Sequence, residues 1–243
     1  ITLVDSMADS PQLLAALEET VCPLLLFLLE HKLHDVYDEV FELVESFTYL
    51  RKTVSPSVWR VIEHFVLVLV PSCDLDYVDE VAVVVDNAVT YGPMTFRGNH
   101  RLLAAVMDIA KRVMTMSDDD SYGYSNEQES VLEMMEAVLL SNPSGSASEG
   151  MQQVVQMFVG LTMSKVAEEK CDTNTMTILH LEVVLAGLIA DASNVVSLLE
   201  AHNWSEVFVA KLALLGEKFT RVHDKRLVIA GISSILNKIK LSD

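Results

Sequence analysis

Apolar segments of about 15 to 20 residues recur along this chain, and each one ends at a short group of Pro, Gly, Asn or acidic residues. Roughly ten or eleven such segments follow one another. Within them apolar side chains return every three or four residues, as Val40, Phe41, Val44 and Phe47 do, which is the spacing of one face of an α-helix. A long series of helices with short connections is typical of an α-solenoid.

Start and stop signals predict where these helices begin and end. Ser55 followed by Pro56 is a cap with proline in the first turn, and Ser125 with Gln128 forms a capping box. Tyr91, Gly92 and Pro93 together stop a helix. The expected helices span about 11–28, 34–48, 55–70, 74–91, 102–114, 125–139, 150–167, 174–190, 194–202, 205–218 and 223–241.

The first expected helix is rich in leucine and contains Pro23. A proline inside a helix removes a hydrogen bond and clashes with the preceding turn, so we expect a kink there. The Val-rich runs 65–70 and 81–85 could form strands, but they lie inside longer helical patterns without hairpin turns, and helix is expected. The expected buried stripe of the first helix consists of Leu13, Leu14, Leu17, Val21, Leu24, Leu25 and Leu28.

The repeating unit of about 40 to 50 residues contains two helices, which is the spacing of HEAT repeats. Residues 1–243 are therefore expected to form a single all-α solenoid, a HEAT/ARM-like α-α superhelix of about five helical hairpins. Stacked repeats also explain the hydrophobic fraction of 51%, because neighbours cover each helix on two sides. The longest uninterrupted apolar run, Val21–Leu29, is well below the roughly 18 residues that indicate a membrane-spanning helix.

The cysteines and the first residues indicate the cellular compartment and whether the sequence is part of a longer chain. Cys22, Cys73 and Cys171 are odd in number and far apart in sequence, which favours free thiols in a reducing compartment. The first residues are acidic rather than basic, unlike those of a signal peptide. The sequence begins at Ile1 in the middle of a helical pattern, so we expect a piece of a longer solenoid.

The formal net charge is −18, from 17 basic and 35 acidic side chains. The imbalance lies in residues 1–210, since the stretch from Lys211 onward holds seven basic and three acidic residues. This excludes nucleic acid as a direct partner, because binding a phosphate backbone requires a basic surface. A basic protein is the natural complement of such a chain.

Acidic residues recur on three consecutive second helices of the expected hairpins. Their spacing of three and four residues places them on one face of each helix, and second helices line the concave surface of a solenoid. The pattern predicts an acidic ladder that could bind a basic ligand, although the same residues could simply be the solvated faces of amphipathic helices. The candidate residues are Asp38, Glu42 and Glu45, then Asp79 and Asp86, then Glu129, Glu133 and Glu136, with the loop residues Asp118, Asp119 and Asp120 as a further candidate contact.

No arrangement of residues predicts catalysis, a cofactor or a metal site. His31 and His34 flank an expected turn, and no cysteine or carboxylate completes a ligand set around them. His64 and His180 lie in apolar helices, where satisfied core histidines are common. An all-α enzyme would need a deep pocket that joins two of these histidines or Cys171.

Several stretches of the chain resemble a known family. They are 36–51, read as VYDEVFELVESFTYLR, then 54–59, read as VSPSVW, then 76–80, read as DYVDE, and, near the end, 223–232, read as HDKRLVIAGI. In this order they resemble the late HEAT repeats of the importin-β superfamily of nuclear transport receptors, and most of all the importin seven and importin eight type. The loops 117–124 and 141–150 depart from the family.

The resemblance implies a non-catalytic carrier that shuttles between cytoplasm and nucleus. Such receptors bind basic cargo such as ribosomal proteins and histones, contact nuclear pore proteins, and release cargo when the GTP form of Ran binds. Ran contacts in this family lie mainly in N-terminal repeats, so none is assigned to residues of this chain. The alternative is a cytosolic HEAT-repeat scaffold subunit, which would hold one folded partner through an apolar patch.

Overall fold

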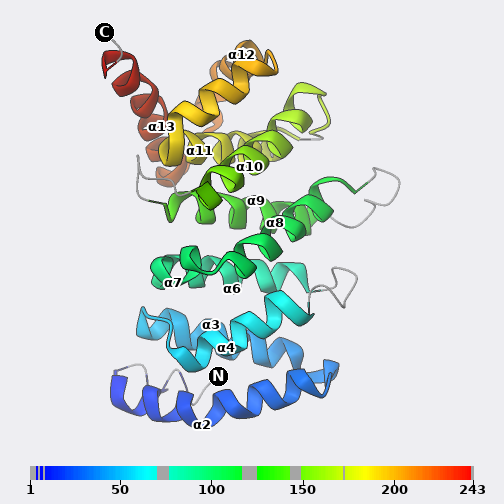
Figure 1. Ribbon diagram of the computed structural model, residues 1–243, viewed down its shortest axis with the longest axis vertical. Coiled ribbons are helices and arrows are strands. Elements are labelled where there is room, and N and C mark those ends of the chain that lie inside the picture. Colours follow the sequence, from blue (N-terminus) through cyan, green and yellow to red (C-terminus); the bar gives the residue numbers. More distant parts are fainter. Residues whose placement is uncertain are drawn as a thin grey trace. The chain divides into compact units, whose positions relative to one another are not determined.

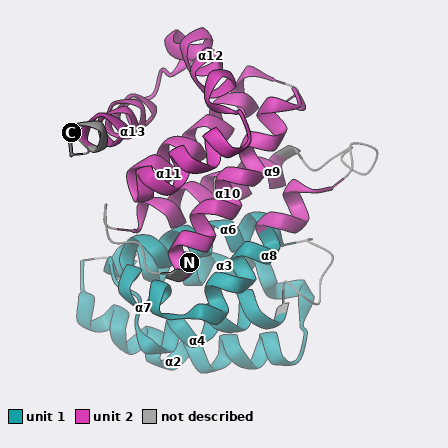
Figure 2. Ribbon diagram, turned by 45° about the horizontal axis from the view of Figure 1, so that its top comes forward, with its two compact units in different colours: residues 1–109 teal, residues 110–243 magenta. Residues whose placement is uncertain are grey.

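The computed structural model describes residues 4, 6–7, 9–69, 77–116, 125–142, 149–171 and 173–241. Within these ranges the regular structure is entirely helical and contains no strand. The predicted all-α, HEAT/ARM-like fold is confirmed. The chain divides into two compact units, Ile1–Ile109 and Ala110–Asp243, which Figure 2 shows in different colours.

Unit 1 is a stack of helices (Figure 1). The helix α2 packs against α3 and α4, and α6 packs against α3 and, less extensively, α4. The helix α8 begins in unit 1 and its last residues fall in unit 2. The elements are α2 (Pro11–Glu30), η1 (His34–Val36), α3 (Tyr37–Arg51), α4 (Pro56–His64), the π-helical turn η2 (Phe65–Leu69), α6 (Val78–Tyr91), α7 (Pro93–Gly98) and α8 (His100–Met114).

Unit 2 is built around one long helix, α11, which packs against α9, α10, α12 and α13. At Asp191 the backbone of α11 leaves the helical region, with φ −153° and ψ 83°. The Asp191 carboxylate accepts a hydrogen bond from the Asn194 N–H at 3.2 Å, so it caps the second half of the helix. The elements are α9 (Ser125–Leu140), α10 (Glu149–Ala167), α11 (Asn174–Ala201), α12 (Ser205–Leu215), η3 (Gly216–Lys218) and α13 (Val222–Leu241).

Local sequence signals account for several helix ends. The Ser55 hydroxyl accepts a hydrogen bond from the Val58 N–H at 3.2 Å, which makes Ser55 the predicted cap of α4. Thr173 caps α11 in the same way through the Met176 N–H at 3.1 Å. At the other end of α3, Lys52 adopts the left-handed conformation with φ 53°, which terminates the helix.

The predicted buried stripe of α2 is wrong in part. Leu14 and Leu25 are buried, but Leu13 and Leu24 are 54% exposed. The buried face instead consists of Leu14, Glu18, Cys22, Leu25 and Leu29. The difference arises because leucines occupy several sides of α2, so neighbouring helices and the ion pair of Glu18 decide which side is buried.

Other differences concern helix ends and continuity. The expected helices at 174–190 and 194–202 are one helix with a break at Asp191, and a short helix, α7, precedes α8. The helix α2 continues through Pro23, where the expected kink stays a prediction. Residues 81–85 lie in α6 and 65–69 in η2, so both Val-rich runs are helical where they are described. Cys73 and the loop 117–124 lie outside the described residues.

Among the residues that the structure describes, two helices, α2 and α11, are long and apolar enough to cross a membrane by length and composition alone. Core helices of globular proteins meet the same criterion. The helix α11 meets it as the central helix of unit 2, whereas α2 buries one face against α3 and α4.

Candidate functional site

Acidic side chains form a stripe on each of two neighbouring helices in unit 1, α3 and α6. On α3, Asp38, Glu42 and Glu45 are exposed at the spacing i, i+4, i+7. On α6, Asp79 and Asp86 occupy the corresponding positions i and i+7, with Asp86 exposed and Asp79 half-buried. Because α3 and α6 pack together, the two stripes belong to adjacent helices. We call these five residues the α3–α6 acidic face.

Few cations are available to neutralise this face. The helix α6 contains no lysine or arginine, and the only one in α3, Arg51, forms an ion pair with Glu18 of α2. Among the described residues, none forms an ion pair with Asp38, Glu42 or Asp86. Negative charges left unpaired on a surface create a field that attracts a cationic ligand.

The surroundings of the two carboxylates on α6 differ from those of the carboxylates on α3. Although the Asp86 side chain reaches solvent, partial burial raises the pKa of its carboxyl, and a hydrogen bond from the Thr90 hydroxyl at 3.5 Å opposes this shift. The Asp79 Oδ1 atom is buried and has no hydrogen-bond partner in the described part of the chain. A cationic group that reached this atom would satisfy it.

Lys52 lies at one end of the α3–α6 acidic face, where it contacts the C-terminal residues of both helices. The Lys52 ammonium donates a hydrogen bond to the Tyr91 hydroxyl at 2.9 Å. It also lies 3.4 Å from the centroid of the Tyr49 ring, which is cation–π geometry. Lys52 therefore links the end of α3 to the end of α6 and leaves the carboxylates farther along the helices unpaired.

The third set of predicted residues, on α9 in unit 2, separates into two groups. Glu129 and Glu133 are exposed, as expected. Glu136 is buried and hydrogen-bonded to His223 of α13, so the expectation that it continues an exposed stripe is wrong. Burial raises the pKa of Glu136, and His223 opposes that shift. The loop candidates Asp118, Asp119 and Asp120 lie outside the described residues.

A second ionic cluster, which the sequence did not reveal, fastens α13 to α11. The Glu182 side chain is completely buried, and both of its oxygens accept from the Arg221 guanidinium, at 2.9 and 3.2 Å. Arg221 Nε also donates to Asp224 at 2.6 Å, and the Arg221 backbone N–H donates to the other Asp224 oxygen at 3.1 Å. Burial would raise the pKa of Asp224, but these hydrogen bonds lower it. Arg221 itself is 54% exposed, and its bonds to the buried carboxylates Glu182 and Asp224 link the start of α13 to α11.

This cluster predicts a pH dependence of stability. Burial raises the pKa of Glu182 to about 8; Arg221 opposes the shift, and Asp224 and Glu136 add to it. Because the folded-state pKa lies above the unfolded value of 4.5, folding favours the protonated Glu182 carboxyl. The stability that this proton uptake adds is complete below pH about 4.5 and is lost as pH rises toward 8. Between pH 6 and 8 we expect the free energy of unfolding of wild-type unit 2 to fall by about 2 kcal/mol more than that of the Glu182→Gln variant.

Urea denaturation at pH 6, 7 and 8 measures this difference. The control is Glu200→Gln, which changes an exposed glutamate of the same helix and should leave the pH dependence unchanged. Parallel pH curves for the wild type and Glu182→Gln would show that Glu182 does not take up a proton on folding.

The side chains considered for chemistry are held in structural roles. The His180 ring is buried and its Nδ1–H donates to the Met176 carbonyl at 2.8 Å; burial lowers the pKa of this imidazole. His31 donates in the same way to the Phe27 carbonyl. Burial, with Glu18 nearby and Arg60 opposing, raises the pKa of the Cys22 thiol to about 12, which suppresses its reactivity. No group of three metal-ligating side chains occurs among the described residues.

Comparison with known proteins places this chain beside importins. It is 22% identical over 241 residues to a probable importin-7 homolog of Dictyostelium discoideum and 20% identical over 243 residues to Importin-8 of the mouse, with 97% of this chain covered in each case. It is 20% identical over its whole length to "Nonsense-mediated mRNA decay protein 5" of Saccharomyces cerevisiae. No family model and no solved structure matches it.

The chain spans about a fifth of the length of these curated relatives, 21% to 23%. The matches cover most of this chain and agree with its helical fold, so they support a place in the importin-β superfamily.

Proposed function

We propose that this chain is a HEAT-repeat segment of a nuclear import receptor, and that it contributes to binding basic protein cargo without chemistry of its own. The observation that carries the proposal is the α3–α6 acidic face, whose carboxylates form no ion pair within the described part of the chain. The similarity to importins over most of the chain supports the same assignment. Ribosomal proteins and histones have the charge that such a face would bind.

In the proposed cycle the receptor binds cargo in the cytoplasm, passes the nuclear pore and releases cargo in the nucleus when Ran-GTP binds. Contacts with Ran are proposed to lie mainly in repeats outside residues 1–243, and contacts with pore proteins are not assigned to residues here. The whole segment 1–243 is proposed to be one continuous part of that receptor.

Charge reversal on α3 tests the cargo-binding part of the proposal. The triple variant Asp38→Lys, Glu42→Lys, Glu45→Lys should bind purified core histones at least about tenfold more weakly than the wild type at low salt. All three residues are exposed, so folding should be unaffected. Wild-type binding should also weaken as salt rises to physiological strength, because added ions screen exposed charges.

The matched control reverses the same number of charges elsewhere. Glu19→Lys, Glu30→Lys and Glu200→Lys change exposed glutamates outside the α3–α6 acidic face and should alter affinity by less than about threefold. Equal losses in both triple variants would mean that histones respond only to net charge. Unchanged affinity in the α3 variant would mean that these acids are a solvated helix face.

A cytosolic scaffold subunit is the alternative function. A pulldown of the wild-type chain and of a full-length relative with basic ribosomal proteins, with and without Ran locked to GTP, distinguishes the two. Release of cargo from the full-length protein by Ran-GTP supports the import receptor, and binding that is indifferent to Ran supports the scaffold.

A further inference from the structure

The last two helices of unit 2 expose an unusual amount of apolar surface. Six of their apolar side chains are 39% to 74% exposed, far more than core residues. An apolar patch of this kind commonly marks an interaction site. We call the set the α12–α13 apolar surface; it consists of Val209, Leu214, Val222, Ile229, Ile232 and Leu236.

On α13 these residues form a stripe opposite the face that already packs on unit 2. The packed face contains Leu227 and Gly231; a Cβ atom built on Gly231 would lie 2.9 Å from Leu185 Cδ2 of α11. The exposed stripe contains Val222, Ile229 and Leu236, which are spaced seven residues apart. A seven-residue apolar repeat is the pattern along which a second helix packs.

The helix α12 is apolar on both sides. Of its eleven residues, only Ser205, Glu206 and Lys211 are polar. One side buries Phe208 and Leu215, and the other exposes Val209 and Leu214. A helix that is hydrophobic all round is normally covered by protein on every side.

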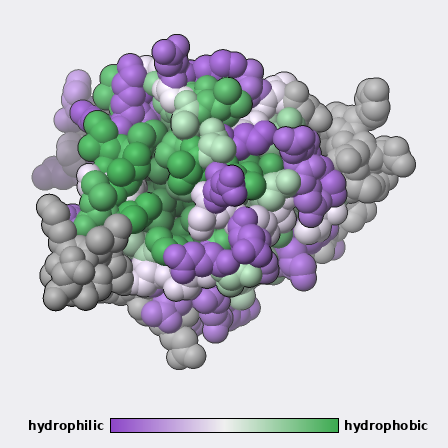
Figure 3. Space-filling model, turned by 90° about the horizontal axis from the view of Figure 1, so that it is seen from above, coloured by the Kyte–Doolittle hydropathy of each residue, from purple (hydrophilic) through white to green (hydrophobic). Residues whose placement is uncertain are grey.

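The two helices both pack on α11 and diverge from each other, as Figure 1 shows. The space-filling view onto this part of unit 2 shows hydrophobic residues gathered around a hollow, with hydrophilic residues around them (Figure 3). A hollow lined in this way can accept an elongated apolar element such as the ridge of a helix.

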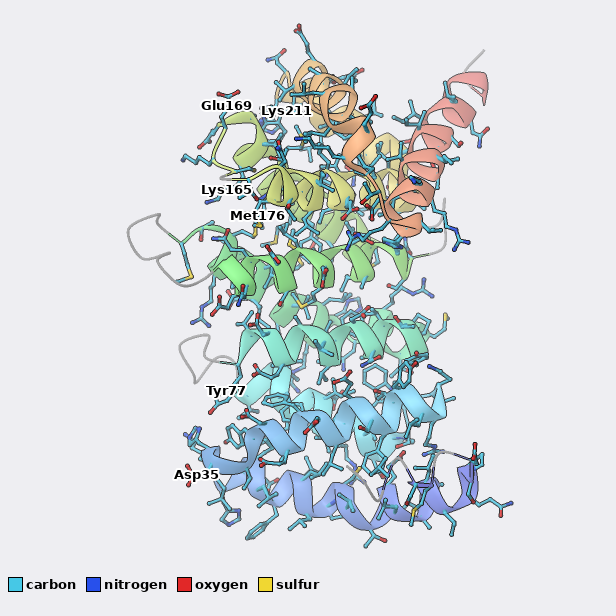
Figure 4. All side chains as sticks on the ribbon, turned by 180° about the vertical axis from the view of Figure 1, so that it is seen from behind. Asp35, Tyr77, Lys165, Glu169, Met176 and Lys211 are labelled. Atoms are coloured by element: carbon cyan, nitrogen blue, oxygen red, sulfur yellow. The ribbon has the colours of Figure 1, made fainter. Side chains whose placement is uncertain are left out.

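The charges beside this surface are unusual for so acidic a chain. Lys218, Lys225 and Arg226 are exposed, and within the described part of the chain none of them forms an ion pair. Two further cations of this part are occupied: Lys211, labelled with Glu169 in Figure 4, pairs with Glu169 at 3.4 Å, and Arg221 pairs with Glu182 and Asp224.

We propose that the α12–α13 apolar surface binds an acidic amphipathic helix of a partner protein. The apolar side of that helix would lie along Val222, Ile229 and Leu236, and its carboxylates would pair with Lys225 and Arg226. A second copy of this chain would present the same two cations in its α13 and not the carboxylates that would pair with them, which disfavours it. The surface is distinct from the α3–α6 acidic face and selects a partner of opposite charge.

Fluorescence anisotropy with a designed peptide tests the proposal on the 243-residue chain. The probe is a labelled synthetic helix with leucine along one side and glutamate elsewhere. We expect Ile229→Glu and the double variant Lys225→Glu, Arg226→Glu each to weaken binding at least about tenfold. The control Val83→Glu, which places the same charge at an exposed apolar position of α6, should leave binding unchanged.

A second peptide, with lysine in place of every glutamate, separates this proposal from the cargo-binding one. Its binding should be insensitive to Ile229→Glu and should weaken in the α3 triple charge-reversal variant. Failure of the acidic peptide to bind, or equal binding to both α13 variants and the wild type, overturns the proposal. So does sedimentation showing a dimer that Ile229→Glu converts to a monomer, because the surface would then hold a second copy.

Discussion

Arg51→Met is expected to lower the free energy of unfolding of unit 1 by about 3 kcal/mol, the lower end of the cost of breaking a buried ion pair. Glu18 is only 2% exposed, and the Arg51 guanidinium is its ion-pair partner. Without that partner the carboxylate stays buried in α2 with no compensating charge. The change should be measured by chemical denaturation followed by circular dichroism.

Two further variants show whether the loss comes from the unpaired carboxylate. Glu18→Met combined with Arg51→Met should restore most of the stability, since apolar side chains of similar volume can replace a buried ion pair. Arg60→Met removes one positive charge from an exposed position of α4 and should change stability by less than about 0.5 kcal/mol. A double variant as unstable as Arg51→Met would attribute the loss to the arginine's packing.

Leu185→Ala is expected to destabilise unit 2 by about 2 to 5 kcal/mol, the usual range for a buried leucine. Leu185 is completely buried in α11 and lies against Gly231 of α13. Truncation opens a cavity that the surrounding helices can fill only in part. Denaturation of the variant beside the wild type gives the value.

The chain offers a matched control in Leu214→Ala. Leu214 is 74% exposed on α12, so the same chemical change should cost less than about 0.5 kcal/mol. A large loss for Leu214→Ala would mean that its side chain is covered in the folded protein. Equal small losses for both leucines would mean that α11 and α13 do not pack as described.

Local signals in the sequence were enough to predict most of the helices, although α7 was missed and α11 was expected as two helices. Ser55 with Pro56 marked the start of α4, and alternating apolar and acidic positions marked the exposed side of α3. The burial of α2 could not be predicted in the same way. Leucines on several sides of α2 leave more than one possible buried face, and the choice depends on Arg51, 33 residues after Glu18.

The candidate site shows the same difference between what local sequence determines and what distant contacts determine. The exposure of Asp38 and Glu42 follows from the pattern of α3 itself. The burial of Glu136 depends on His223, which is 87 residues away in sequence, so no local pattern contains it. The spacing of Val222 and Ile229 was visible in the sequence, but only the packing of α13 shows that this stripe is left uncovered.

The central position of α11 affects how unit 2 should unfold locally. In many repeat proteins each repeat contacts only its neighbours, so an end can fray while the rest stays folded. Here α9, α10, α12 and α13 all share α11 as a partner. Local unfolding of any one of these helices therefore removes contacts with α11. We expect unit 2 to unfold as one cooperative unit around α11, and not as a series of repeats that unfold separately.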